Sequence, residues 1–114
     1  MQEDTILNEG HLNMLKSILD KQKFGDLLDL YVKDSERLIQ ECRQAIQQEK
    51  WQDLFESAHA LKGSSANLGV MGVSDLAKSL ELAAKDHNKI LSLSLMGNLS
   101  EIQKKAISEL DKLR

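Results

Sequence analysis

The segment Trp51–Gly69 has the sequence WQDLFESAHALKGSSANLG. Its small and apolar residues recur at alternating intervals of four and three, which is the period of one face of an α-helix. Gly69 follows the last of them, where a helix commonly ends in a left-handed glycine. The segment therefore predicts a helix from about Trp51 to Leu68 whose inward stripe is Leu54, Ala58, Leu61, Ser65 and Leu68.

Similar periodicity on both sides of this segment predicts four more helices. A short lead-in helix, capped by Asn8 or Thr5, should run to about Asp20. The others should span about Phe24–Glu49, Val73–Asp86 and Lys89–Leu113, with a loop at Val70–Gly72. The last of these is expected to turn inward Leu91, Leu95, Leu99, Ile102, Ala106, Leu110 and Leu113.

Composition and loop lengths favour an all-α fold. The 114 residues contain no proline and six glycines, fewer turn residues than a β-rich domain of this size usually needs. Short connections between long amphipathic helices favour antiparallel neighbours. We therefore expect one domain over residues 1–114, an antiparallel up-down-up-down four-helix bundle with a short N-terminal helix packed across one end.

Charge and cysteine content exclude several classes of protein. The net charge is −3, whereas a nucleic-acid binder needs a concentrated basic surface. No apolar run is long enough to span a membrane, and the first residues lack the pattern of a secretory signal. The single cysteine, Cys42, is expected in the core and cannot form an internal disulfide. These features predict a soluble cytoplasmic domain that binds neither nucleic acid nor membrane.

His59, Lys62 and Gly63 depart from a plain bundle pattern. They lie at positions i, i+3 and i+4, so they share one helix face, beside the inward stripe. A surface imidazole has a pKa of about 6.5 and a nucleophilic ring nitrogen near neutral pH. A glycine inside a helix costs about 1 kcal/mol relative to alanine, and here it leaves room for another protein to reach the ring.

The string HALKGSSANLG at residues 59–69 resembles the signature of histidine-containing phosphotransfer (HPt) domains, His-x-x-Lys-Gly-small-small-x-x-Leu-Gly. The resemblance covers essentially the whole chain. It implies a phosphorelay intermediate of two-component signalling, in which His59 accepts a phosphoryl group and Lys62 helps balance its charge. Gly63 would give a partner access, and Gly69 would end the helix.

The resemblance also implies partners and neighbouring residues. The partners would be the receiver domain of a hybrid sensor histidine kinase and that of a response regulator. Since such encounters are transient and their interfaces small, we expect the chain itself to be a monomer. Ala60, Ser64, Val70 and Met71 are candidates for the exposed docking surface. If the third and fourth helices pack antiparallel, Glu81 lies near His59 and can orient the imidazole, although it can equally be an ordinary exposed charge.

The chain is expected to be a phosphocarrier and not an enzyme. It has no glycine-rich phosphate loop, kinase motif or carboxylate cluster for Mg²⁺, so it should bind no cofactor of its own. The receiver would supply the Mg²⁺. Neither His11 nor His87 precedes a Lys-Gly pair, and the single Glu-x-x-His at Glu56 is weak evidence for a metal site.

Two other interpretations stay open. A helical adaptor without phosphotransfer would have the same periodicity, with His59 incidental. The chain could also be a module of a larger hybrid sensor kinase, although its initial methionine and lack of a linker favour a free-standing protein.

Overall fold

Side chains that cap their first turns begin three of the helices. The computed structural model describes residues 6–114, where Asn8, Asp20 and Asn88 accept hydrogen bonds from the backbone N–H three residues later. The alternative cap Thr5 lies outside the described residues. The helices of this part of the chain are α1 (Glu9–Ile18), α2 (Lys21–Gln47), α3 (Trp51–Leu68), α4 (Met71–Lys85) and α5 (Lys89–Asp111).

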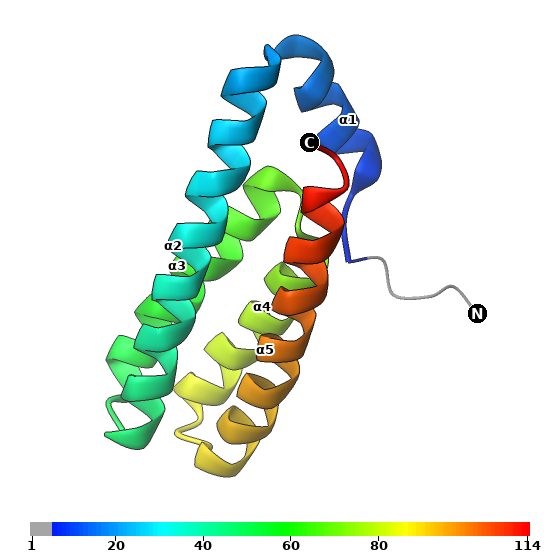
Figure 1. Cartoon of the computed structure of the whole chain (residues 1–114). Coiled ribbons are helices and arrows are strands. Elements are labelled where there is room, and N and C mark those ends of the chain that lie inside the picture. The colour runs from blue at the N-terminus through cyan, green and yellow to red at the C-terminus, as the bar shows by residue number, and fades with distance from the viewer. Residues whose placement is uncertain (1–5) are drawn as a thin grey trace, which may run out of the picture.

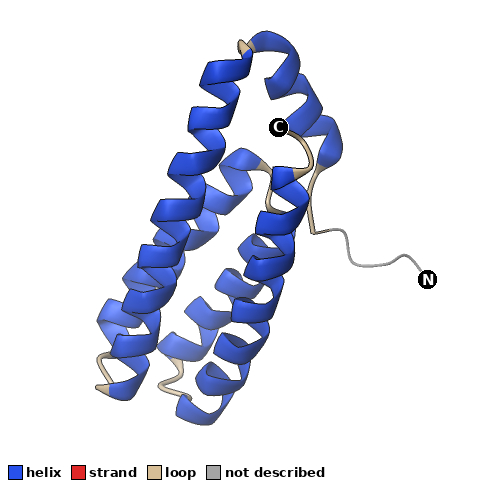
Figure 2. Ribbon diagram, viewed as in Figure 1, coloured by secondary structure: helices blue, strands red, loops and turns tan. Residues whose placement is uncertain are grey.

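Helices α2 to α5 form the bundle, and each of α2, α3 and α4 is followed by an antiparallel neighbour (Figure 1). The α2–α3 and α4–α5 connections lie at one end, and the α3–α4 turn lies toward the other (Figure 2). Since α2 has 27 residues and α3 has 18, α2 is longer by about 14 Å at 1.5 Å per residue. The predicted four-helix bundle with a short N-terminal helix at one end is confirmed.

The segment before α1 is tied to the α3–α4 turn. The Asn8 N–H donates to the Gly69 carbonyl at 2.7 Å, and the Gly72 N–H donates to the Ile6 carbonyl at 3.0 Å. Leu7 and Leu12 are buried beside these bonds and join the main core. Residues 6–8 therefore pack against the end of the bundle at the α3–α4 turn.

The core is aliphatic, with a few polar side chains that pair with one another. The Tyr31 hydroxyl lies 2.7 Å from Ser65 Oγ, and Gln103 Nε2 donates to Ser35 Oγ at 2.9 Å. These pairs link α2 to α3 and to α5, and they fix the relative positions of the three helices. The largest fully buried apolar side chains are Leu12, Leu28, Cys42, Ile46, Leu54, Leu61, Val70, Val73, Leu80, Leu99 and Leu110.

Several predicted boundaries were wrong by two or three residues. Helix α2 begins at Lys21 instead of Phe24 because Asp20 caps it, and it ends before Glu49, whose φ is 53°. Helix α4 begins at Met71 instead of Val73, since Gly69 and Val70 alone make the turn. The remaining ends lie at Ile18 for α1, Lys85 for α4 and Asp111 for α5.

The inward face of α5 was also partly mispredicted. Leu91 is 44% exposed, and the buried line instead includes Ser92, Met96 and Gln103. Ser92 can be buried because its hydroxyl donates to the Asn88 carbonyl at 2.7 Å. The buried face of α5 is therefore less hydrophobic than the sequence pattern predicted, because its polar side chains form hydrogen bonds.

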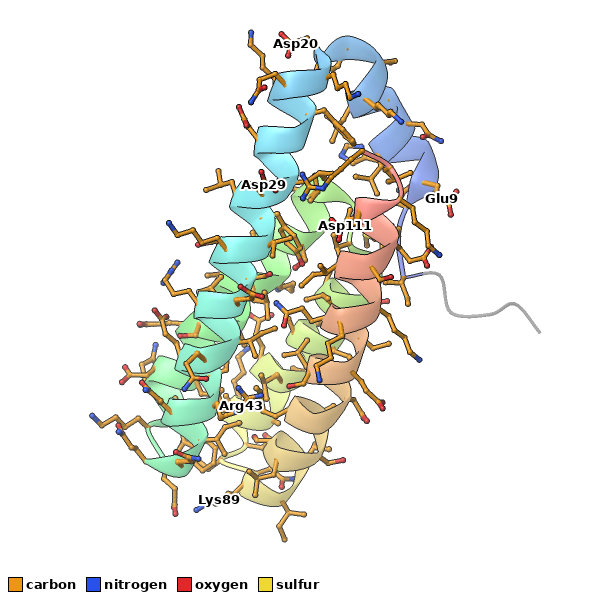
Figure 3. The ribbon with its side chains drawn as sticks, viewed as in Figure 1. Glu9, Asp20, Asp29, Arg43, Lys89 and Asp111 are labelled. Carbon is orange, nitrogen blue, oxygen red and sulfur yellow. The ribbon has the colours of Figure 1, made fainter. Side chains whose placement is uncertain are left out.

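Charged side chains surround the bundle, and a few reach between helices (Figure 3). Arg43 of α2 donates to Ser100 Oγ of α5 at 2.8 Å, and Lys89 pairs with Glu49 at the end where α5 begins. None of the described helices combines the length and apolar character needed to cross a membrane.

Candidate functional site

Helix α3 presents His59 on its outer face. Ala58 and Leu61, on the inward stripe, are completely buried, and this fixes the rotation of the helix about its axis. The His59 side chain is consequently 63% exposed, in the middle of a regular helix. The ring is accessible, while the backbone that carries it is held on both sides by core residues.

Glu81 of α4 holds one nitrogen of this ring. Its carboxylate Oε2 lies 2.8 Å from His59 Nδ1, as the antiparallel packing of α3 and α4 predicted. The Glu81 side chain is only 8% exposed, so the alternative of an ordinary exposed charge is wrong. The hydrogen bond thus joins the exposed imidazole of His59 to the nearly buried carboxylate of Glu81.

Lys62 forms an ion pair with the other carboxylate oxygen of Glu81. Its Nζ lies 2.7 Å from Glu81 Oε1. Burial by itself raises the pKa of Glu81, but hydrogen bonds from Lys62 and His59, with their charges, outweigh it and hold the pKa below its ordinary 4.5. Glu81 is therefore ionised at neutral pH and acts only as a hydrogen-bond acceptor.

The ionised carboxylate selects one tautomer of the neutral histidine. Because Glu81 Oε2 can only accept, the ring proton lies on Nδ1, and this N–H donates to it. Nε2 is then left with its lone pair. The site offers a nucleophilic nitrogen on an exposed ring, with a buried negative charge behind it and a lysine balancing that charge.

An aromatic ring lies one turn before the histidine. The centroids of the Phe55 and His59 rings are 6.0 Å apart, and the ring planes are 14° from parallel. Lys85 Nζ of α4 lies 5.5 Å from the centre of the Phe55 ring. The position of Phe55 on the same side as His59 follows from the i−4 spacing, but sequence alone did not predict the stacking or the lysine.

The structure explains the two glycines of the motif, Gly63 and Gly69, in different ways. A Cβ atom built on Gly63 would meet no atom within 4 Å, so the space beside His59 is open. Gly69 has a φ of 101°, and a Cβ there would lie 3.3 Å from His11 Cδ2 and 3.4 Å from the Asn8 carbonyl oxygen. Gly69 is the predicted helix end, whereas Gly63 has no packing role that requires glycine.

The predicted docking residues do not all lie at the surface. Ala60 is exposed, and Ser64 is half-buried on the same helix as His59. Met71 is half-buried at the start of α4, twelve residues beyond His59 along the chain. The prediction that Val70 is exposed was wrong, because its side chain is fully buried in the core and has no surface to offer a partner.

The other histidines have structural contacts of their own. His11 Nε2 lies 2.9 Å from the Asn67 carbonyl oxygen, and the His87 ring stacks on Trp51 with centroids 5.6 Å apart. Across residues 6–114, no three His, Cys, Asp or Glu side chains gather as a metal site would require. Among the three histidines, His59 is therefore the one whose surroundings suit a chemical role.

The comparison with protein families decides the identity. The family model described as the Hpt domain matches residues 26–113, which include the whole of α3 and its motif.

The chain belongs to the Hpt domain family.

Hpt domains are phosphorelay intermediates of two-component signalling that interact with receiver domains of response regulators. The chain is therefore such an intermediate, a phosphocarrier by family.

Solved structures share this fold. The crystal structure of histidine-containing phosphotransfer protein B (HptB) from Pseudomonas aeruginosa PAO1 matches with a TM-score of 0.88 at 24% sequence identity. That match covers 96% of this chain and 95% of the other. A putative histidine-containing phosphotransfer protein from rice matches with a TM-score of 0.81 at 19% identity, over 95% of this chain and 81% of the other. Among curated proteins, none matches the chain significantly.

Proposed function

We propose that His59 is the phosphoacceptor of this Hpt domain. It takes a phosphoryl group from an aspartyl phosphate of one receiver domain and passes it to an aspartate of another. The observation that supports this most strongly is the hydrogen bond from His59 Nδ1 to Glu81, 2.8 Å long, on a ring that is 63% exposed. It assigns the lone pair to Nε2, the nitrogen away from Glu81.

The phosphoryl transfer requires no base, because Nε2 carries no proton that must be removed. The Nε2 lone pair attacks phosphorus, a nitrogen–phosphorus bond forms, and the bond from phosphorus to the aspartyl oxygen breaks with its electron pair leaving on the carboxylate. The ring keeps its proton on Nδ1 and becomes a phosphorylated imidazolium. Glu81 faces that new positive charge directly, so its carboxylate stabilises the product and the charge that develops before it.

Lys62 keeps Glu81 from repelling the phosphoryl group. A carboxylate near a phosphate is unfavourable by itself, but the 2.7 Å contact between Lys62 and Glu81 makes the pair neutral overall. The Lys62 side chain is one-third exposed and lies on the face that carries His59. It is therefore placed to interact with an incoming phosphoryl oxygen while holding Glu81.

The remaining parts of the reaction come from the partner. The transition state of phosphoryl transfer is loose, so positioning and electrostatics supply most of the catalysis. We propose that the receiver provides the Mg²⁺ and that the chain, as a phosphocarrier, neither binds ATP nor phosphorylates itself. The donor would be the receiver of a hybrid sensor kinase, the chain would act as a cytoplasmic monomer, and docking would use Ala60, Gly63, Ser64 and Met71.

The test is transfer of label from a phosphorylated receiver in the presence of Mg²⁺. The wild-type chain should gain one phosphoryl group that is lost in acid and kept in base. His59→Gln should gain none and keep its helical circular dichroism, whereas the control double variant His11→Gln, His87→Gln should be labelled like wild type. Labelling of His59→Gln would contradict the assignment. If wild type is not labelled even by phosphoramidate, a small phosphodonor, the adaptor interpretation replaces it.

A further inference from the structure

One hydrogen bond does not fix the orientation of the His59 ring. The ring is attached through Cγ and restrained at Nδ1 by Glu81, but a hydrogen bond tolerates a range of distances and angles, so the ring can still rock about the Cα–Cβ and Cβ–Cγ bonds. Nε2 lies on the far side of the ring, so a tilt changes the direction of its lone pair. A histidine 63% exposed has few neighbours to prevent this movement.

Phe55 supplies the second constraint. Its ring lies nearly parallel to the imidazole, with the centroids 6.0 Å apart, inside the range of favourable offset stacking. A tilt of the imidazole out of this plane loses the stacking contact or brings the rings into collision. The Phe55 stack therefore narrows the range of ring orientations that the Glu81 hydrogen bond alone would allow.

The Phe55 ring is itself held from two helices. It is partly buried and packs against the main core from α3. Lys85, from the last turn of α4, places its ammonium 5.5 Å from the ring centre, within the distance of a cation–π contact. Because these contacts restrain the Phe55 ring, it can in turn restrain the orientation of the imidazole stacked beside it.

We propose that Phe55 is a positioning residue for phosphotransfer, setting the plane of the His59 imidazole so that Nε2 meets the phosphorus in line. This inference rests on the proposed role of His59 as phosphoacceptor. It concerns the rate of the chemical step and not the affinity for the receiver. Any apolar side chain could pack against the core at this position, but only an aromatic ring can stack.

The chain contains a matched control for the same kind of contact. Trp51 lies one further turn toward the start of α3 and stacks on His87, with centroids 5.6 Å apart and planes 11° from parallel. That pair joins α3 to the α4–α5 connection and involves no residue of the phosphotransfer site. Loss of the Trp51 ring should therefore affect stability and leave the transfer chemistry unchanged.

The experiment measures single-turnover phosphorylation by two donors, phosphoramidate and a phosphorylated receiver with Mg²⁺. Phe55→Leu keeps an apolar side chain but removes the stack, and it should lower the rate with phosphoramidate and the saturated rate with the receiver by about tenfold. Phe55→Tyr keeps the stack and should restore the rate. The receiver concentration at half-maximal rate should not change, and Trp51→Leu should match wild type with phosphoramidate.

Proton NMR provides a readout that a purely structural role would not produce. The ring current of Phe55 should displace the His59 ring-proton resonances in wild type and in Phe55→Tyr, and this displacement should disappear in Phe55→Leu. If Phe55→Leu does not fold, Phe55→Met replaces it as the variant without a ring.

Three results overturn the proposal: wild-type rates in the folded variant without a ring, unchanged ring-proton shifts, or a change confined to half-saturation by the receiver, which would mean docking. Failure of wild type to be labelled at His59 would instead refute the proposed function.

Discussion

Gly63→Gln should separate phosphotransfer from folding. A Cβ at Gly63 meets no atom within 4 Å, so the folded chain accepts a side chain there without a clash. Gly63 lies one helical turn beyond His59, and Cβ atoms at this spacing are about 6 Å apart. A glutamine can therefore extend across the space by which a receiver reaches the imidazole.

The substitution should raise the thermal stability of the chain and lower its rate of phosphotransfer. Glutamine is a better helix former than glycine by roughly 0.5 kcal/mol, which raises the melting temperature of a domain of this size by about 2 °C. Transfer from a phosphorylated receiver should fall by at least about tenfold, the equivalent of about 1.4 kcal/mol in the barrier. Phosphoramidate is small, so its transfer rate should fall much less.

Gly97→Gln is the matched control. Gly97 also lies inside a helix, is exposed, and has no atom within 4 Å of a built Cβ, but it belongs to α5. It should show the same gain in thermal stability with wild-type transfer. Thermal unfolding and single-turnover labelling of both variants give the comparison. Receiver transfer by Gly63→Gln at the wild-type rate would refute the argument that this glycine provides access.

Two further variants test polar contacts, one beside the histidine and one in the core between α2 and α3. Glu81→Gln replaces a charge-assisted hydrogen bond by a neutral one, a loss of about 1–1.5 kcal/mol, so the single-turnover rate should fall by about tenfold; an unchanged rate would remove Glu81 from the mechanism. Since the pKa of Glu81 is lower in the folded chain, its stabilising effect is complete above the ordinary pKa of 4.5 and disappears as pH falls through the folded pKa. Urea unfolding should therefore show wild type more stable than Glu81→Gln at pH 7, with the difference shrinking in acid, and a constant difference would contradict this assignment. Tyr31→Phe removes the buried hydroxyl that pairs with Ser65 and should cost about 1–2 kcal/mol of stability in urea with wild-type transfer, whereas unchanged stability would show that the pair contributes nothing.

The sequence predicts the fold well where the local pattern and the terminating residue agree. For α3, the stripe from Leu54 to Leu68 and the left-handed Gly69 mark the C-terminal end, and the predicted end at Leu68 matches the structure. For α4, no residue before Met71 has a side chain that caps the helix, so the start was placed two residues late. Helix ends without a local cap depend on tertiary contacts that spacing does not encode.

The polar side of the core was harder to predict because its partners are far apart in the sequence. Gln103 is buried only because it donates to Ser35, 68 residues away. A periodicity argument ranks positions by hydrophobicity and therefore favoured exposed Leu91 over buried Ser92. Such pairs become visible only when the helices are placed next to each other.

The sequence predicted that His59, Lys62 and Glu81 lie together and that Glu81 can contact the imidazole, but it did not predict the other contacts of the site. The spacing of His59 and Lys62 placed them on one face of the helix, and the antiparallel packing brought Glu81 to the same level. The ion pair between Lys62 and Glu81 and the stack of Phe55 on His59 depend on side-chain rotamers. Val70 was misplaced because a short turn buried against the core looks like an exposed loop in sequence.

The most direct test of the account is to locate the phosphoryl group on the phosphorylated chain. Mass spectrometry of peptides under basic conditions identifies the residue, and long-range proton–nitrogen NMR of the labelled imidazole distinguishes the two ring nitrogens. The account predicts one phosphoryl group on Nε2 of His59, with Nδ1 still protonated and hydrogen-bonded to Glu81. A phosphoryl group on Nδ1, or on any other residue, would contradict it.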